Sequence, residues 1–457
     1  MEFFLDEINE ILGFINWNDS ERINLQFNSV SIDSRTISQD ELFIAIKGDN
    51  YDGINFVDEA ISKGIKAVVI KNGSENILPS KLPFWSVPDT LLAFQKLALL
   101  KRKKLKLPVI AITGSVGKTT TKEITSKVLE TFGKVHKSEA NFNNEVGVGL
   151  TLINTDASHK VIVLEMGMRG FGQIENLSKF SEPDIAIITN IGSSHIGLLG
   201  SRENIAIAKC EIVKHLNPDG LVIIPYGDKL LDKAIKKVWQ GRIIRIKLLS
   251  SFNDCQQIES NHDLVVGFYD PHGDLIKVEN KTFSISFNGI HNARNFLFSY
   301  AVSKEFGINF EEFNELNFVP MNGRNNILKT KKLTIFDETY NASPESIKAC
   351  IKILIQQNGN QFFVFGSMKE LGNMSNEFHI EILNYIYSST IEKCIFLHDP
   401  EQKIMQEKYQ YLEKKIFFVT DRELICPILN KLTNKGDFLL IKGSRDWELE
   451  KIIPSID

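Results

Sequence analysis

One short segment, VIAITGSVGKTTTK at residues 109–122, constrains the fold of this chain more than any other. Its first four residues, Val109–Ile112, are apolar and mostly β-branched, which is typical of a buried parallel strand. A turn with two glycines follows, and Lys118 and Thr119 then open a predicted helix. Glycines let backbone N–H groups approach an anion, and a helix N-terminus adds about half a positive charge. The segment therefore predicts a nucleotide phosphate site at the end of a strand.

The loop in this segment is shorter than the common GxxxxGKT pattern. It reads GxxGKT, because Ile112 occupies the position of the first glycine. Lys118 is expected to reach the β- and γ-phosphates, and the Thr119 hydroxyl to bind Mg²⁺. An ordinary strand–helix turn can carry the same spacing, but the apolar strand before it and the helix after it favour a phosphate site. The predicted cradle consists of Gly114, Ser115, Val116, Gly117, Lys118, Thr119 and Thr120.

The composition is that of an ordinary globular protein. The chain has 457 residues, of which 43% are hydrophobic and 24% charged, and this length is typical of two to four domains. A net charge of −4 gives no general attraction to nucleic acid or to anionic membranes. No apolar run reaches the ~18 residues of a membrane span, and the acidic start argues against a signal peptide. The cysteines lack metal-ligand spacing, which favours reduced thiols in a cytoplasmic protein: Cys210, Cys255, Cys350, Cys394 and Cys426.

The pattern of strands and helices divides the chain into three blocks, residues 1–86, 87–315 and 316–457. The second and third blocks alternate strand and helix, which is typical of parallel α/β sheets, and the third is expected to be doubly wound. Residues 242–290 suggest an antiparallel excursion, and the basic run at 101–106 is expected to be a solvated helix end rather than a partner patch. The expected strands are Leu42–Ile46, Ala67–Ile70, Val109–Thr113, Val161–Glu165, Ile185–Asn190, Leu221–Pro225, Leu333–Asp337, Phe362–Gly366, Cys394–His398, Ile416–Thr420 and Phe438–Lys442.

Polar residues stand at several of these strand ends, where open parallel sheets collect their ligands. Glu165 ends an apolar strand and is a natural Mg²⁺ ligand, although a capping or salt-bridged carboxylate is an equally open interpretation. His195 lies on a loop after the next strand, and a lone histidine is more often structural. Lys209 follows on a helix, where a lysine is ordinarily a solvated charge. Asp337 begins the segment DETYNASPES, which can meet the nucleotide only if the third block folds over the second.

Together these motifs resemble those of the Mur ligases of bacterial cell-wall synthesis. The resemblance covers essentially the whole chain, and within the family it is strongest to members that add a D-alanyl-D-alanine dipeptide. It rests on the short phosphate loop, on the His195 loop and on the segments SIDSR at 31–35, LFIAIKG at 42–48, NFNNEVG at 141–147, EMGMRG at 165–170, DETYNASPES at 337–346 and GSMKELG at 366–372.

The resemblance implies a three-domain α/β fold. It comprises an N-terminal uridine-nucleotide-binding domain, a central P-loop ATPase-like domain with a parallel sheet, and a C-terminal Rossmann-like, doubly wound domain. It also implies an ATP-dependent amide-bond ligase that needs Mg²⁺. The carboxylate of a UDP-N-acetylmuramoyl-tripeptide would attack the γ-phosphate of ATP, and the amine of D-alanyl-D-alanine would then displace phosphate from the acyl phosphate. We expect a cytoplasmic monomer, and leave open whether the third peptide residue is lysine or diaminopimelate.

The resemblance also assigns roles to individual residues. The implied catalytic residues are Lys118, Glu165, His195 and Lys209. The implied metal ligands are Thr119, Glu165, His195 and Lys209, the last as a carbamate, which reverses the ordinary interpretation of that lysine. Further contacts to the nucleotide are implied for His291, Asn292, Asn295, Arg324 and Asp337. Substrate contacts are implied for Ser34, Arg35, Lys47 and Gly48 at the uridine end and for Asn141, Asn143, Asn144, Tyr340 and Asn341 at the peptide end.

Three alternatives remain. A related ligase that adds a single amino acid, or a glutamate tail to folate, would share the phosphate loop but lack the Tyr340 segment. A non-catalytic nucleotide-binding protein would have lost groups such as Lys118. A P-loop kinase would need no dipeptide amine. The chain departs from the family pattern at Asn55, Ser138, Ser343 and Gly149, where relatives commonly have His, Thr, Asn and Pro.

Overall fold

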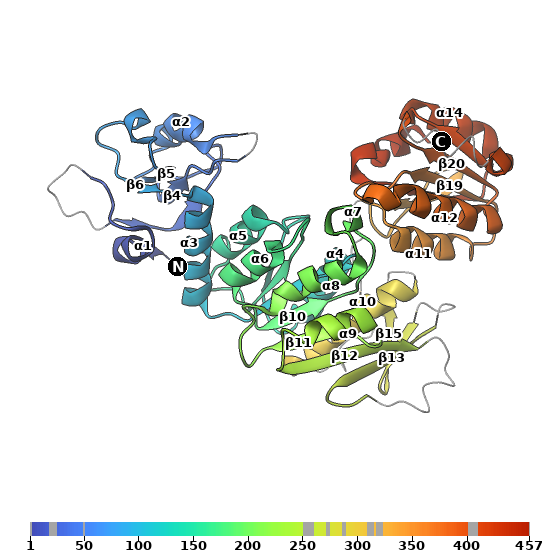
Figure 1. Ribbon diagram of the computed structural model, residues 1–457, viewed down its shortest axis with the longest axis horizontal. Coiled ribbons are helices and arrows are strands. Elements are labelled where there is room, and N and C mark those ends of the chain that lie inside the picture. Colours follow the sequence, from blue (N-terminus) through green and yellow to red (C-terminus); the bar gives the residue numbers. More distant parts are fainter. Residues whose placement is uncertain are drawn as a thin grey trace.

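The computed structural model describes residues 2–17, 25–48, 51–249, 260–270, 275–285, 289–308, 315–316, 323–400 and 410–456. Within them the strands form one sheet in each of three parts of the chain, together with a two-stranded ladder near the N-terminus. Figure 1 shows the N-terminal and C-terminal parts at opposite ends, with the central part between them. The predicted three-part α/β fold is confirmed, and the division at residues 86 and 315 stays a prediction.

The N-terminal part is built on a small parallel sheet in the order β3-β4-β5-β6. Two of its strands correspond to the predicted strands at 42–46 and 67–70. The strands are β1 (Phe3–Phe4), β2 (Gln26–Phe27), β3 (Ser29–Ser31), β4 (Glu41–Ile44), β5 (Val68–Lys71) and β6 (Phe84–Val87). The helical segments are α1 (Leu5–Leu12), η1 (Gly53–Phe56), α2 (Val57–Ser62) and η2 (Glu75–Ile77).

The helix α3 (Thr90–Leu105) joins the N-terminal part to the central one, and its basic end is solvated only in part, at Lys103 and Lys106. Lys101 is buried, with Nζ 5.5 Å from the centre of the Phe3 ring. The Nζ atom of Lys104 donates to the carboxylate of Glu7 at 2.7 Å. The prediction of a solvated end fails for Lys101, Arg102 and Lys104, because this end of the helix packs between the N-terminal segment and the central sheet.

The central sheet has the order β16-β15-β14-β13-β12-β11-β10-β7-β9-β8 in the described residues. Neighbouring strands from β7 to β13 pair in parallel. Strands β13, β14 and β15 form an antiparallel meander, which confirms the predicted antiparallel excursion. The strands are β7 (Val109–Thr113), β8 (Val135–Lys137), β9 (Val161–Glu165), β10 (Ile185–Ile188), β11 (Leu221–Pro225), β12 (Arg242–Leu249), β13 (Leu264–Asp270), β14 (Leu275–Val278), β15 (Lys281–Ile285) and β16 (Glu315–Leu316).

Helices cover both faces of this sheet, because its central strands are apolar on both sides. Ile110 and Ile112 of β7 face the hydrophobic core shared with α4 and α10, whereas Val109 and Ala111 face the core shared with α3, α5, α6 and α8. The helical segments are α4 (Lys118–Leu129), α5 (Glu145–Ile153), α6 (Gln173–Ser181), α7 (Ile196–Leu199), α8 (Arg202–Cys210), η3 (Glu211–Val213), α9 (Lys229–Ile235) and α10 (Ile290–Glu305).

The C-terminal part is doubly wound, as predicted. Its sheet has the order β17-β18-β22-β19-β20-β21, with α11 and α12 packed on one face and α14 and η11 on the other. The strands are β17 (Asn326–Lys329), β18 (Leu333–Glu338), β19 (Gln361–Gly366), β20 (Lys393–Leu397), β21 (Ile416–Val419) and β22 (Asp437–Lys442). The helical segments are α11 (Pro344–Leu354), η6 (Gly372–Met374), α12 (Ser375–Ser388), η8 (Gln410–Lys414), η9 (Arg422–Leu424), α14 (Ile425–Leu432), η10 (Arg445–Trp447) and η11 (Leu449–Ser455).

Cysteines in the described parts of the chain are free thiols. Cys210, Cys350 and Cys394 are buried, Cys426 is partly exposed, and Cys255 lies outside the described residues. Burial raises the pKa of Cys210 to about 12, so this thiol stays protonated and unreactive at neutral pH. No helix in the described ranges is both long and apolar enough to cross a membrane.

Candidate active site

The phosphate loop connects β7 to α4, which begins at Lys118 as predicted. Two of its glycines have backbone conformations that other residues rarely adopt, with φ of +153° at Gly114 and +83° at Gly117. A side chain at either glycine would also collide with its neighbours. A Cβ at Gly114 would lie 1.8 Å from Oγ1 of Thr189, and one at Gly117 would lie 2.8 Å from Oδ1 of Asn295. Both glycines are therefore required by conformation and by packing.

The segment after β10 braces this loop. Thr189 Oγ1 and Asn190 Nδ2 donate to the carbonyl oxygen of Val116 at 2.6 and 2.8 Å, and Asn190 Oδ1 accepts the Val116 N–H at 3.1 Å. The backbone N–H of Gly192 donates to Oγ of Ser115 at 2.9 Å. Sequence reasoning missed Thr189 and Asn190, although both end a strand next to β7 and so lie at the expected edge of the sheet.

A hydroxyl and a carboxylate meet at the first turn of α4. Thr119 Oγ1 donates to Oε2 of Glu165 at 2.7 Å, and both side chains are buried. Asn143 Nδ2 donates to the other carboxylate oxygen at 2.8 Å, and the Glu165 N–H donates to Oγ of Ser138 at 3.1 Å. Converging hydroxyl and carboxylate oxygens are the ligands that Mg²⁺ prefers, so these residues fit the ion.

Cations surround this carboxylate. Lys118 Nζ donates to the Gly114 carbonyl at 3.0 Å. Burial lowers the pKa of Lys118, while the charge of Glu165 opposes and that of Arg324 adds to the effect. Burial, with the nearby charge of Lys118, lowers the pKa of Lys209 far below its usual value. Three basic residues from two parts of the chain, Lys118, Lys209 and Arg324, thus lie close together, which suits the binding of phosphates.

His195 precedes α7 with a φ of +64°, and its ring faces the C-terminal part of the chain. Its Nδ1 lies 2.5 Å from Oε2 of Glu370. Across the described residues, no group of three or more His, Cys, Asp or Glu side chains is placed to hold a metal. In the arrangement described, a metal bound by Thr119 and Glu165 has room for further ligands from phosphate, water or other side chains.

The predicted adenine-side residues lie on the first turns of α10, at the junction with the C-terminal part. Asn295 contacts the phosphate loop at Gly117, and Asn292 Nδ2 donates to Oδ1 of Asn325 at 2.9 Å. Burial lowers the pKa of His291 to about 4, with smaller contributions from the charges of Lys442 and Arg294. His291 is therefore neutral at pH 7.

In the C-terminal part, Arg324 and Tyr340 form a stacked pair, with the guanidinium carbon 3.7 Å from the ring centre. Asp337 is engaged within its own part. Its Oδ2 accepts the Gly323 N–H at 3.1 Å, and its Oδ1 accepts the Thr339 hydroxyl at 2.7 Å. The immediate effect of Asp337 is thus to fix the turn that presents Arg324.

The segment before α5 carries Asn141, Asn143 and Asn144. The side chains of Asn143 and Asn144 form hydrogen bonds within the described residues. Asn143 reaches Glu165, and Asn144 Oδ1 caps α5 by accepting the Gly147 N–H at 2.8 Å. Asn141 is exposed, as is Asn341 in the C-terminal part. Exposed amides at this sheet edge are available to a ligand.

Departures from the family pattern have local structural explanations at three positions. Ser138 keeps the hydroxyl that accepts the Glu165 N–H. Ser343 caps α11 by accepting the Ser346 N–H at 3.3 Å. A Cβ at Gly149 would lie 2.3 Å from the ring of Phe94 on α3, so only glycine fits this helix contact.

The predicted uridine-end residues lie in the N-terminal part and not beside the phosphate loop (Figure 1). Ser34 Oγ donates to Oε2 of Glu59 at 2.5 Å. The guanidinium of Arg35 pairs with Asp33 at 2.7 Å, and the Gly48 N–H donates to the Tyr51 carbonyl at 2.8 Å. Lys47 Nζ lies 3.5 Å from Asp52 Oδ2. Sequence reasoning did not anticipate the carboxylates Glu59 and Asp52.

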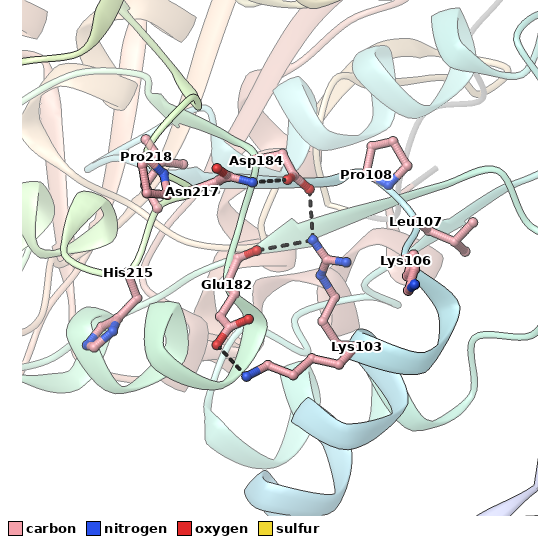
Figure 2. A pocket seen from close by; sticks show the side chains of 11 residues that line it. Lys103, Lys106, Leu107, Pro108, Glu182, Asp184, His215, Asn217 and Pro218 are labelled. Atoms are coloured by element: carbon pink, nitrogen blue, oxygen red, sulfur yellow. Dashed lines mark hydrogen bonds and ion pairs between the residues drawn. The ribbon is translucent and has the colours of Figure 1, made fainter.

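A hollow of about 740 Å³ lies at the opposite end of the central sheet, beside residues that precede β7, β10 and β11. Several of its polar groups bind one another (Figure 2). Arg102 Nη2 donates to Oδ2 of Asp184 at 2.8 Å, and the same oxygen accepts the Val109 N–H at 2.8 Å. Lys103 pairs with Glu182 at 3.0 Å. The polar residues that line this hollow therefore join α3 to the sheet, and they do not form a site for phosphate chemistry.

Comparison with known proteins identifies the family. Three family models match the chain: Mur ligase family, catalytic domain, at residues 26–102; Mur ligase middle domain at 112–303; and Mur ligase, glutamate ligase domain, at 323–445. A UDP-N-acetylmuramoyl-tripeptide–D-alanyl-D-alanine ligase from Bacillus subtilis is 35% identical, with 94% of this chain and 93% of the relative covered. The chain belongs to the Mur ligase family.

Further relatives agree with this assignment. A Synechocystis protein of the same name is 32% identical, with 95% of this Mur ligase and 92% of the relative covered. The structure of a MurF ligase from Thermotoga maritima in complex with ADP is 28% identical and superposes with a TM-score of 0.79, covering 93% of this chain and 96% of that one. Both the sequence and the fold are thus those of a Mur ligase along nearly the whole chain.

Proposed function

We propose that this Mur ligase joins D-alanyl-D-alanine to the tripeptide carboxylate of a UDP-N-acetylmuramoyl-tripeptide, with conversion of ATP to ADP and phosphate, in peptidoglycan precursor synthesis. The names of the Bacillus subtilis and Synechocystis relatives support this substrate pair. The observation that carries the proposal is the buried pair of Thr119 and Glu165 at the start of α4, beside a glycine-rich loop. That pair belongs to a site for metal-assisted phosphoryl transfer.

The chemistry explains why ATP is needed. A peptide carboxylate is a poor acyl donor at neutral pH, and transfer of the γ-phosphoryl group to its oxygen creates a leaving group. The amine of the dipeptide then attacks the acyl carbon, a tetrahedral intermediate forms, and phosphate departs. In such a site the protein positions the reactants and neutralises charge on the transferring group. Bound Mg²⁺ would supply Lewis-acid charge neutralisation at Thr119 and Glu165.

Residues of the site take the following proposed roles. Lys118 neutralises phosphoryl charge from the first turn of α4, while Asn292, Asn295 and the neutral His291 line the nucleotide side. Arg324, presented by Asp337, brings a cation from the C-terminal part toward Lys118. The uridine end is bound by Ser34, Arg35, Lys47 and Gly48, and the peptide end by Asn141, Asn143, Asn144, Tyr340 and Asn341.

We propose that His195 is a metal ligand through Nε2, with Glu370 orienting the ring from Nδ1, and that Lys209 is carbamylated. The structure favours a neutral amine at Lys209, because burial and the charge of Lys118 lower its pKa. Only a neutral amine attacks carbon dioxide, and after loss of one proton the product is a carbamate anion with two oxygen donors. No hydrogen bond or ion pair holds the Lys209 amine among the described residues, which leaves it available.

The domain roles are also a proposal: residues 1–86 bind the uridine nucleotide, 87–315 bind ATP and 316–457 complete the ligase site. The enzyme is proposed to act as a cytoplasmic monomer. All proposed site residues belong to one chain, and the free thiols suit a reducing compartment.

The test measures phosphate release from ATP by the purified full-length chain. Phosphate should appear only when a UDP-N-acetylmuramoyl-tripeptide and D-alanyl-D-alanine are both present. Parallel reactions with the lysine and the diaminopimelate tripeptides identify the third residue. Undiminished ATP turnover without the dipeptide, with a stable phosphorylated product, would show a kinase instead. Turnover with a single amino acid in place of the dipeptide would show a different ligase of the family.

A further inference from the structure

A carboxylate of the C-terminal part is bound to the segment that follows β10. Glu345 lies in the first turn of α11, and its Oε1 accepts both the backbone N–H and the hydroxyl of Ser193, each at 2.8 Å. Its other oxygen, Oε2, is buried and has no hydrogen-bond partner among the described residues. The hydrogen bonds that the Glu345 carboxylate accepts in the described residues thus come from Ser193.

The segment that Glu345 holds also holds the phosphate loop. The Gly192 N–H donates to Oγ of Ser115 at 2.9 Å, and Ser194 Oγ donates to the Ser115 carbonyl at 3.3 Å. Contact is close here, because a Cβ at Gly192 would lie 3.1 Å from both Cδ of Glu345 and Cβ of Ser115. One short chain of contacts thus runs from α11 through Ser193 to the phosphate loop.

A second contact fixes the same segment a few residues later. The Gly197 N–H donates to the carbonyl oxygen of Glu370 at 3.1 Å. A Cβ at Gly197 would lie 2.4 Å from the backbone nitrogen of Gly372, so the two backbones touch directly. The C-terminal part therefore contacts the segment 192–197 at both of its ends. A movement of the C-terminal part would displace this segment and, with it, the phosphate loop.

We propose that Glu345 is a positioning residue that couples the C-terminal part to the nucleotide site through Ser193 and Ser115. The start of α11 is suited to this role, because the Ser343 cap fixes the helix end that carries Glu345. A carboxylate in the first turn is also stabilised by the helix dipole. Glu345 contacts neither nucleotide nor substrate in this role. It acts by holding the loop whose backbone surrounds the phosphates.

The inference rests on the nucleotide site proposed above, and ADP is the probe because it binds that site without any chemical step. The dissociation constant of ADP is measured by calorimetry in the presence of Mg²⁺, together with kcat and the KM for ATP. Glu345→Ala removes an acceptor of two hydrogen bonds and should weaken ADP binding by about tenfold, with a fall in kcat. Glu345→Gln keeps a side-chain carbonyl oxygen for both donors and should stay within about threefold of the wild type.

Two further variants separate coupling from simple stabilisation. Glu381→Ala alters the same interdomain cavity but removes only a pair with the partly exposed Lys348, so ADP binding should not change. Ser193→Ala should weaken ADP binding less than Glu345→Ala, since the backbone N–H remains. It should add nothing in the Glu345→Ala background, because both changes break one chain of contacts.

The outcomes are distinguishable. If Glu345→Ala lowers the melting temperature but leaves the ADP dissociation constant and kcat within twofold of the wild type, Glu345 is only an interface residue and the inference is wrong. Additive effects of Ser193→Ala and Glu345→Ala would also overturn it. If the wild-type chain itself does not bind ADP, the proposed function fails instead.

Discussion

His195 and Glu370 face each other across the junction between the central and C-terminal parts, with Nδ1 of the imidazole 2.5 Å from Oε2 of the carboxylate. The interaction with His195 is the main cause that lowers the pKa of Glu370, and Arg169 contributes a smaller effect. A side chain proposed to bind metal is therefore held by another part of the chain in this arrangement. Because this contact engages only Nδ1, metal binding at His195 would use its other ring nitrogen, Nε2, while Glu370 orients the ring.

Replacement of Glu370 by Gln is expected to loosen this junction. The pair is partly exposed, so the loss in the free energy of unfolding should not exceed about 1 kcal/mol. The radius of gyration from small-angle X-ray scattering should increase as the C-terminal part detaches. Arg169→Gln is the matched control, because Arg169 lies 3.4 Å from the same carboxylate but its side chain is 76% exposed. Equal scattering from wild type and Glu370→Gln would show that the pair does not hold the junction.

Substitution of Gly197 by Ala should disturb the same junction through sterics alone. The added Cβ would lie 2.4 Å from a backbone nitrogen of Gly372 and 2.8 Å from the Glu370 carbonyl oxygen, and neither backbone atom can rotate away. We expect a loss of about 1–3 kcal/mol in thermal or denaturant unfolding. Gly170→Ala meets nothing within 4 Å and serves as the control. A Gly197→Ala protein as stable as the control would show that the two parts separate freely in solution.

Lys118→Ala should abolish measurable phosphate release while leaving the uridine-linked substrate bound. Removal of one group that stabilises transferring charge commonly costs about 10²–10³ in kcat, and Lys118 also neutralises bound phosphates. The UDP-N-acetylmuramoyl-tripeptide should bind as tightly as to the wild type, as measured by calorimetry without ATP, because Ser34 and Arg35 lie in another part of the chain. Loss of that binding as well would show that the uridine end was assigned to the wrong residues.

Acid should destabilise the C-terminal part through His379. Its Nε2 accepts the Met368 N–H at 2.8 Å and its Nδ1 contacts the Ser375 carbonyl at 2.6 Å, an arrangement that suits the neutral ring. Burial lowers its pKa from 6.5 to about 4. The unfolded chain therefore binds the proton first as pH falls. The stability from this group is complete above pH 6.5 and is lost as pH falls toward 4, by about 3 kcal/mol in all.

The measurement for His379 is the free energy of unfolding of wild type and His379→Gln across pH 7 to 4. Glutamine can donate and accept but does not titrate in this range. The stability of the wild type relative to the variant should therefore decline as pH falls, whereas the effect of His291, whose pKa is also lowered, cancels in the difference. Curves that stay parallel would contradict a neutral buried ring at His379.

Much of the fold is readable from the sequence, because its main strands are buried on both faces. The strands Val109–Thr113, Val161–Glu165 and Leu221–Pro225 match the prediction to the residue, since the first four residues of each are an uninterrupted apolar run. The three-residue strands Val135–Lys137 and Ser29–Ser31 were not foreseen. They lie at sheet edges and are too short to show a periodicity.

The candidate site also contains residues that could be placed from the sequence and contacts that could not. Thr119, in the first turn of the helix that follows β7, and Glu165, at the end of β9, could be placed together from sequence because neighbouring parallel strands share one edge. The partners of His195 and Ser193 could not. Glu370 and Glu345 lie in a separately folded part of the chain, and their contacts depend on how that part packs against α7.

The connecting helix α3 has a practical consequence for dissecting this enzyme. Its Phe94 and Leu97 lie in the core shared with the central sheet, and Arg102 reaches Asp184, while Lys104 reaches back to Glu7. A fragment that begins after α3 would leave the central core uncovered, whereas one that ends before it would strip Glu7 of its cation. Both the N-terminal and the central part need α3 to complete their packing, so a stable fragment of either part must include this helix.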